Sequence, residues 1–383
     1  GLARFAYGML LPGMRAGLGF DYARMGMIST GNFAGYLVSV ALVPKLMQLL
    51  RPRATVSAGL GLIALCMLAM GTASSFAWLL VLYVLVGFGG GLANIPAMVL
   101  VSHWFRKSAR GRAAGLMIAG NGSAIVFAGF FIPWLERIVA DGSAWRVGWL
   151  SLGVIALVIT LVVALLLRND PAELGLEPVG RAGEGQVAVA NAPVGGAGLL
   201  LHLGGLYLIF GTTYMVYGTF IVSSMVDEYG LSSQQAGLYW SWVGVLSIFS
   251  GVLFGGLSDR IGRRGGLATV FAVQTAAYLL AGSGWGVGAL VLSIILYGSA
   301  AFAIPTIMTA AVGDYFGVQQ AARAFAFITF CFAAGQTIGP GGAGWLKELA
   351  GSFAPAFLAS AALTGAGVLL AFLLPGRSRG AGA

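Results

Sequence analysis

The chain has 383 residues, of which 58% are hydrophobic and 9% are charged, against about 25% charged residues in soluble domains. This composition excludes a soluble globular protein, and it excludes a disordered chain, which is poor in apolar residues. The net charge is +9, but the basic residues lie in short gaps between apolar runs, so we exclude nucleic acid as a partner. Two cysteines and two histidines in separate runs predict neither a metal site nor a cofactor.

The apolar runs are long enough to cross a bilayer as helices. A transmembrane helix needs roughly 20 apolar residues, and these runs lack the alternation of β-barrel strands. In chain order, the predicted spans are 1–18, 26–48, 54–73, 77–101, 112–135, 147–167, 199–224, 234–257, 266–283, 286–308, 321–345 and 353–375. The first run begins inside an apolar stretch, so we expect that helix to be truncated. The sequence therefore predicts an all-α membrane protein with twelve transmembrane helices.

The distribution of Lys and Arg between the spans predicts the orientation of the chain. If both termini are cytoplasmic, fifteen basic residues lie on the cytoplasmic side and four lie on the other side. Cytoplasmic loops of membrane proteins carry such an excess. We therefore expect a multi-pass protein of the inner (plasma) membrane with both termini in the cytoplasm.

The spans fall into two sets of six. Residues 168–198 form a long polar stretch with four acidic residues and three prolines, a composition typical of a flexible linker. It separates residues 1–167 from residues 199–383. Phe105 and Arg112 recur with the same spacing as Phe316 and Arg323, between the fourth and fifth spans of each set. This repeat predicts two pseudo-symmetric six-helix bundles.

The loop between the eighth and ninth spans carries a recognisable motif. Residues 255–264 read GGLSDRIGRR, which resembles the cytoplasmic-loop signature of the major facilitator superfamily, G-x-L-x-D-R-x-G-R-R. Twelve spans and a central linker agree with that resemblance. It implies a secondary transporter and not an enzyme, working by alternating access between its two bundles. Among the branches of the superfamily, the chain loosely resembles the monocarboxylate and oxalate–formate transporters.

The charges of this motif suggest a gate. Asp259 lies at a helix end beside Arg260, Arg263 and Arg264, so its carboxylate can cap a neighbouring helix or pair with Arg263. Such a contact would hold two helices together on the cytoplasmic side in one transport state. The alternative is a solvated loop whose arginines only set the topology. The first half has Met47 about where the aspartate is expected, so any latch is asymmetric.

Arg4 is the first candidate for substrate binding. It lies roughly 20 Å from the outer end of the first predicted helix, and a buried ionisable group usually faces the bundle interior or a wet cavity. Its guanidinium suits a carboxylate or a phosphate, and Tyr7 lies one turn away. No acidic residue lies at the centre of a span, which disfavours a cationic substrate. The alternatives for Arg4 are bonds to helix-end carbonyls or an orientation toward the interface.

Polar and aromatic side chains on other spans complete the candidate site. The resemblance implies that spans 1, 4, 7 and 10 line a central cavity and that spans 2, 5, 8 and 11 flank it. Tyr214 and Tyr217 lie in the middle of the seventh span. The remaining candidates are Asn32, Tyr36, Asn94, Asn121, Trp240, Tyr297, Thr329 and Gln336. For each aromatic residue, simple helix packing is the alternative.

These patterns predict a secondary active transporter for a small organic anion, with a carboxylate as the first choice. Proton symport and anion exchange both stay open. The alternative is an exporter of drugs or amphiphilic molecules, which the many aromatic and methionine residues favour and the missing buried acids disfavour. We expect a monomer whose partners are its substrate and the lipid bilayer.

Overall fold

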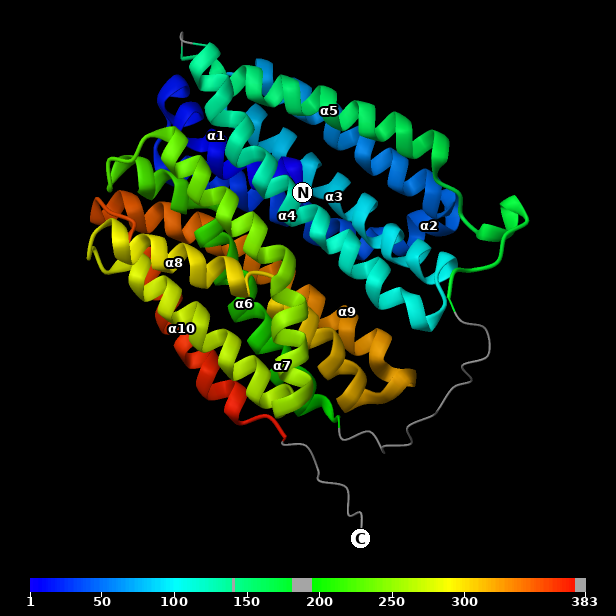
Figure 1. Ribbon diagram of the computed structural model, residues 1–383. Helices are drawn as coiled ribbons and strands as arrows, with labels where there is room; N and C mark the ends of the chain where they lie inside the picture. Colours follow the sequence, from blue (N-terminus) through cyan, green and yellow to red (C-terminus); the bar gives the residue numbers. More distant parts are fainter. Residues whose placement is uncertain (140–141, 181–194, 376–383) are drawn as a thin grey trace.

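The computed structural model describes residues 1–139, 142–180 and 195–375, and the long elements in this part of the chain are all α-helices (Figure 1). A short 3₁₀ turn, η1 (Pro171–Leu174), follows the fifth helix. The helices are α1 (Leu2–Leu18), α2 (Tyr22–Thr72), α3 (Phe76–Trp104), α4 (Lys107–Ile138), α5 (Ala144–Leu166), α6 (Ala197–Asp227), α7 (Ser233–Gly282), α8 (Val287–Ala300), α9 (Ala303–Ala350) and α10 (Ala354–Phe372).

Three of these helices consist of two segments each. α2 has 51 residues and α7 has 50, so each would measure about 75 Å if straight, while the hydrocarbon core of a bilayer is about 30 Å thick. The backbone leaves the helical region at Arg51 in α2, at Gly262 in α7 and at Gly317 in α9. The two parts of α2 and of α7 are therefore separate spans by length.

Each predicted span lies on one helix except 286–308, which covers α8 and the start of α9, and the predicted all-α fold is confirmed. In the described part of the chain, nine helical stretches are long and apolar enough to cross a membrane, and α2 and α7 are two of them. α1, with 17 residues, falls just below that length. The total of twelve crossings stays a prediction.

The helices form two groups. Figure 1 shows α1–α5 on one side of the molecule and α6–α10 on the other, and we call these groups the first half and the second half. α5 ends and α6 begins at the same end of the molecule, which we call the linker end. The connections between α1 and α2 and between α6 and α7 lie at the opposite end.

Part of the predicted linker is fixed against the first half. The backbone N–H of Val179 donates to the carbonyl of Trp104 at 2.9 Å, and the indole N–H of Trp104 donates to the carbonyl of Arg168 at 3.0 Å. Arg106 forms an ion pair of 2.5 Å with Glu177. Residues 181–194 lie outside the described residues, so the flexibility of that part stays a prediction.

Glycines allow the helices of each half to pack backbone against backbone. A Cβ added at Gly87 of α3 would lie 1.7 Å from the carbonyl oxygen of Asn32 in α2. The side-chain amide of Asn32 donates to the carbonyl of Tyr83 at 3.1 Å across the same contact. Small residues at helix contacts in membranes permit this close approach, and Asn32 therefore stabilises the pairing of α2 and α3.

Replacing Gly87 with alanine tests this contact. We expect Gly87→Ala to destabilise the protein by about 1–3 kcal/mol, the usual cost of overpacking, since backbone atoms cannot yield as a flexible side chain can. A thermal unfolding curve of the detergent-purified protein measures the loss. Gly90→Ala in the same helix is the control, because a Cβ there has no atom within 4 Å. Equal effects of the two changes would contradict the proposed contact.

Candidate functional site

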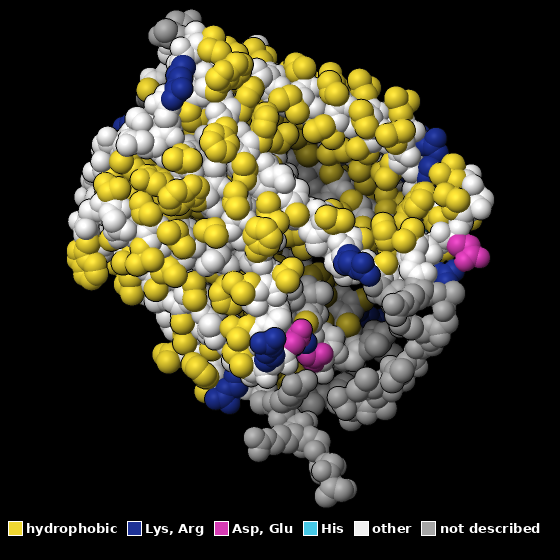
Figure 2. All heavy atoms as spheres, in the orientation of Figure 1, with side chains coloured by type: hydrophobic (Ala, Val, Ile, Leu, Met, Phe, Trp, Pro, Cys, Tyr) yellow, Lys and Arg dark blue, Asp and Glu magenta, His cyan; other side chains and the backbone are white. Residues whose placement is uncertain are grey.

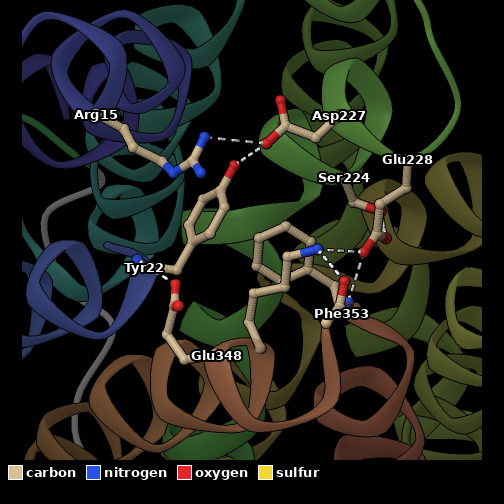
Figure 3. Close-up of polar contacts among 9 residues, drawn as sticks. Arg15, Tyr22, Ser224, Asp227, Glu228, Glu348 and Phe353 are labelled. Carbon is tan, nitrogen blue, oxygen red and sulfur yellow. Dashed lines mark hydrogen bonds and ion pairs between the residues drawn. The ribbon is translucent and has the colours of Figure 1, made fainter. Parts of the chain in front are cut away.

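Asp227 joins the two halves at the end opposite the linker (Figure 3). Its carboxylate pairs with Arg15 at the end of α1, with 3.6 Å between Nη1 and Oδ2, and accepts a hydrogen bond from the hydroxyl of Tyr22. The guanidinium of Arg15 also lies 4.3 Å from the centre of the Tyr22 ring. The backbone N–H of Tyr22 donates to Glu348 of α9 at 2.7 Å. One tyrosine of the first half therefore contacts two carboxylates of the second half.

Glu228, the neighbour of Asp227, acts within the second half. It accepts hydrogen bonds from the ammonium of Lys347 at 2.8 Å and from the backbone N–H of Phe353 at 2.6 Å. The hydroxyl of Ser224 donates to its other oxygen at 2.9 Å. These bonds join the end of α6 to the end of α9 and the start of α10 (Figure 3). Asp227 therefore lies at the end of α6, which these bonds fix to α9 and α10.

Backbone contacts extend this closure toward the middle of the molecule. A Cβ added at Gly26 would lie 2.4 Å from the carbonyl oxygen of Pro340, and one at Gly8 would lie 2.6 Å from that of Gly218. The hydroxyl of Thr30 donates to the carbonyl of Thr337 at 2.8 Å. At Gly8 and at Gly26, any side chain would displace the backbone of the other half.

The linker end is open. Among the described residues, the hydrogen bonds and ion pairs between the first and second halves all lie in the middle of the molecule or at the opposite end. Figure 2 shows the surface hollowed between the two halves on the linker side. The structure is therefore the state that is closed at the Asp227 end and open toward the linker end.

Arg4 lies on α1 between aromatic rings of the first half. Its Cζ is 5.0 Å from the ring centre of Phe33 and 5.1 Å from that of Tyr36, a cation–π arrangement. The ring of the next residue, Phe5, lies 6.2 Å from the ring of Phe302 at the start of α9, so Arg4 lies where α1 meets the second half. Arg4 is half-buried and forms no ion pair with a carboxylate in the described part of the chain.

An aromatic cluster of the second half faces this region. Tyr207 stacks on Phe332 with ring centres 4.7 Å apart, and Phe210 contacts both Phe332 and Tyr214. The ring of Tyr214 lies 6.2 Å from that of Phe302, which is also 6.2 Å from the ring of Phe5 beside Arg4, so this cluster is close to the rings around Arg4. The structure therefore brings together three predicted site residues, Arg4, Tyr36 and Tyr214.

Three other predicted tyrosines use their hydroxyls within their own half. Tyr7 is 1% exposed and donates to the carbonyl of Met25 at 2.7 Å. Tyr297 donates to the carbonyl of Tyr214 at 2.8 Å, and Tyr217 shares a hydrogen bond of 2.9 Å with Ser293. Asn32 likewise bonds within the first half, as described above. These contacts give the four side chains a packing role in this state.

Three predicted residues have buried polar atoms that lack a hydrogen-bond partner among the described residues. They are Trp240 at Nε1, Thr329 at Oγ1 and Gln336 at both amide atoms. Trp240 and Gln336 are fully buried. Two further candidates lie apart from them: Asn94 is exposed on α3, and Asn121 on α4 is half-buried near Gly1. Buried polar groups without partners are rare, so Gln336 stays a strong candidate for a polar ligand contact.

The predicted gate residues form an ion-pair network within the second half. Arg263 binds Asp259 and Asp314 at 2.6 Å each, and it also donates to Ser258 at 3.2 Å. Burial opposes the charge of Arg263, but the bonds to Asp314 and Asp259 outweigh it and raise its pKa. The network thus joins the two segments of α7 to α9.

The other two arginines of the motif do not enter this network. Arg264 lies over the ring of Phe372 at 5.6 Å, and Arg260 is exposed. In this state, the contacts of Arg263 therefore hold the second half together.

The network around Asp227 was not among the predicted site residues. Its sequence signal is the acidic pair Asp227-Glu228 at the end of one span and the pair Lys347-Glu348 at the end of another. The partners of Asp227 and Glu348, which are Arg15 and Tyr22, lie in the other half. Sequence alone does not indicate which helix ends of different halves meet.

The chain is similar to known membrane transporters. The family described as "Uncharacterised MFS-type transporter YbfB" matches residues 1–372. A relative from Chlamydia pneumoniae, described as a probable hexose phosphate transport protein, is 28% identical over 176 residues, which cover 46% of this chain and 38% of that protein. An uncharacterized MFS-type transporter of Mycobacterium tuberculosis, MT3072, is 26% identical over 271 residues, which cover 70% of this chain and 58% of that protein. The matches span well under two thirds of the length of these relatives.

A solved structure shows the same fold. It is a bacterial homolog of the human lysosomal transporter Spinster in an inward-facing and unoccupied conformation, with a TM-score of 0.74 at 16% identity. The match covers 97% of this chain and 93% of that chain. The family match over residues 1–372 identifies the chain as a membrane transporter and not an enzyme. The chain belongs to the MFS-type transporter family of YbfB, within the major facilitator superfamily.

Removing the Tyr22 hydroxyl tests the closure at the Asp227 end. A hydrogen bond to a charged group contributes about 1.5–3 kcal/mol, so we expect Tyr22→Phe to lower the closed fraction about tenfold relative to the open fraction. Spin labels at Ser74 and Trp285, introduced as cysteines after Cys66 and Cys331 are replaced by serine, report the distance across this end. Tyr229→Phe is the control, since its hydroxyl bonds only within the second half. An unchanged distance distribution in Tyr22→Phe would contradict the closure.

Proposed function

We propose that this chain moves a small organic anion across the membrane by alternating access, with Arg4 as the cationic contact for the substrate. The observation that carries the proposal is the position of Arg4, where α1 meets the second half and without an ion pair among the described residues. An unpaired arginine in a partly buried place is costly. An anion that binds there removes this cost, and it contacts both halves that move.

The substrate class is proposed from the guanidinium and from the relatives. A planar guanidinium binds carboxylate and phosphate groups with two parallel hydrogen bonds. The description of a relative as a probable hexose phosphate transport protein supports a phosphorylated sugar beside the carboxylates. Tyr36, Tyr214 and Gln336 are the proposed further contacts. They offer hydroxyl and amide groups around Arg4 and at the aromatic cluster of the second half.

We also propose that the linker end faces the cytoplasm of a cell with an inner membrane, because the basic residues concentrate at that end. The structure then represents an inward-open state. Closure of the linker end and opening of the Asp227 end would release the substrate on the other side. A proton could accompany the anion in this cycle.

Arg4 variants test the substrate proposal. We expect Arg4→Ala to reduce uptake of the anion by about tenfold or more, since one charge-assisted hydrogen bond contributes about 1.5–3 kcal/mol. A thermal-shift screen of the purified protein with carboxylates, sugar phosphates and cationic drugs identifies the ligand, because a ligand raises Tm by mass action. Transport in proteoliposomes is then measured with that ligand.

Two controls belong to this experiment. Arg4→Lys keeps the charge and should retain part of the transport, while Arg24→Gln removes an exposed arginine at the opposite end and should change nothing. Stabilisation by cationic drugs alone, equal in the wild type and in Arg4→Ala, would refute the anion proposal and favour an exporter of amphiphilic molecules.

The ion-pair network of Arg263 gives a separate prediction about the conformational step. Asp314→Asn removes one of its two carboxylate partners, so we expect the transport rate to fall severalfold while the substrate affinity stays within about twofold, because the network does not contact the substrate. Initial rates over a range of substrate concentrations separate the two quantities. Asp170→Asn, a linker carboxylate outside the network, serves as the control. A change confined to affinity would contradict a role in gating.

A further inference from the structure

A pocket lies at the linker end, in the turn between the two segments of α2. It has a volume of about 360 Å³ and is lined by Arg51, Arg53, Ser57, Asn169 and the apolar Leu50, among others. The pocket belongs to the first half and is separate from Arg4. It lies where α2 reverses direction, at the level of the linker.

The backbone at this turn is strained at one residue. Arg51 has φ 60° and ψ 158°, a combination that is essentially restricted to glycine and costs about 1–3 kcal/mol in other residues. The two corresponding turns of the second half use glycine in nearly the same conformation: Gly262 has φ 85° and ψ 161°, and Gly317 has φ 66° and ψ 171°. Among the described residues, Arg51 is the one non-glycine residue with positive φ. A turn that could be built with glycine carries an arginine instead.

The pocket combines positive charge with apolar surface. Arg53 is oriented by its bond to the carbonyl of Ala164 at 2.6 Å and by the side chain of Asn169, which accepts from its backbone N–H at 2.9 Å. Neither Arg51 nor Arg53 forms an ion pair with a carboxylate in the described part of the chain. Leu49 is 79% exposed and Leu50 is 47% exposed beside them.

This combination selects the chemistry of the ligand. Two cationic groups suit a phosphate group, and adjacent exposed leucines suit acyl chains. Basic pockets between transmembrane helices on the cytoplasmic side bind anionic headgroups, and each Lys or Arg near the surface contributes about 1 kcal/mol. We propose that the pocket at Arg51 and Arg53 binds the phosphate of an anionic phospholipid, with its acyl chains on Leu49 and Leu50.

Three substitutions at Arg51 separate its charge from its backbone strain. Arg51→Gln removes the charge and keeps the strain, Arg51→Lys keeps both, and Arg51→Gly removes both. The purified protein is placed in nanodiscs of phosphatidylcholine or of phosphatidylglycerol at equal lipid content, and Tm is measured in each. For the wild type we expect a higher Tm in phosphatidylglycerol, and we expect this increment to persist in Arg51→Lys and to shrink by about half in Arg51→Gln and Arg51→Gly. Arg51→Gly should also have a higher Tm than the wild type in phosphatidylcholine, because its backbone is no longer strained.

A second measurement counts the bound lipid directly. Native mass spectrometry of protein purified from mixed lipid should show about fivefold less phosphatidylglycerol retained by Arg51→Gln and Arg51→Gly than by the wild type, the factor that one contact of about 1 kcal/mol gives. If Arg51→Gln does not fold, Arg51→Gly gives the same comparison on a relaxed backbone. Arg323→Gln, which removes an exposed arginine at the linker end of the second half, is the matched control and should retain the lipid.

The outcomes that overturn the proposal are distinct. Equal losses in Arg51→Gln and Arg323→Gln would show general attraction to a charged surface and no site. Stabilisation by inorganic phosphate alone in phosphatidylcholine, lost in Arg51→Gln, would assign the pocket to a soluble anion. Equal Tm of the wild type in both lipids, with equal lipid retention by all variants, would remove the site. None of these results depends on the identity of the transported substrate.

Discussion

The rest of the structure depends on the contact of Asp227 with Arg15 and Tyr22. It is the one ion pair between the two halves among the described residues, and it lies at one end of the molecule. The pair is partly exposed, with 39% and 30% of the two side chains accessible, so its ionic contribution alone is modest. Its strength comes from the tyrosine hydroxyl, from the ring face under the guanidinium and from the backbone contacts below it. A closure built from several such small terms can open within a transport cycle.

The two ends of the molecule differ in the way that they use charge. At the Asp227 end, opposite charges lie on different halves and hold them together. At the linker end, the two carboxylates around Arg263 belong to the same half as the arginine, so that network makes the second half rigid. Ion pairs within one half do not draw the other half closer, and Figure 2 shows the linker side open.

The helices could be predicted from the sequence because length and hydropathy decide them locally. All predicted spans but 286–308 lie on one helix, and the turn at Gly262 falls in the predicted gap between 257 and 266. The pairing of Asp259 with Arg263 could also be anticipated, since the two residues lie one helical turn apart. By contrast, the hydrogen bond between Tyr22 and Asp227 joins residues that are 205 positions apart. Such a contact depends on how two halves dock, and no local pattern encodes docking.

The candidate site shows the same limit. Residue type and depth indicated Arg4, and it lies where α1 meets the second half. The same reasoning could not separate Tyr214, near Arg4, from Tyr297, whose hydroxyl bonds to a backbone carbonyl, because both are mid-helix tyrosines. The special role of Arg51 could not be predicted from the sequence for another reason. Its charge resembles any loop arginine, and its unusual feature is a backbone angle.

The two arginines of α1 together suggest how charge is balanced through the cycle. Arg15 pairs with the carboxylate of Asp227, while Arg4, eleven residues earlier on the same helix, contacts two aromatic rings and forms no ion pair in the described part of the chain. A guanidinium held out of bulk water without an anion is unfavourable, so Arg4 favours the state in which its side of the molecule is open to solvent, and that is the state observed. On the proposed function, a bound anion supplies the missing charge and removes this preference. The state with a closed linker end then becomes accessible to the protein, and in that state the pair of Arg15 and Asp227 can separate.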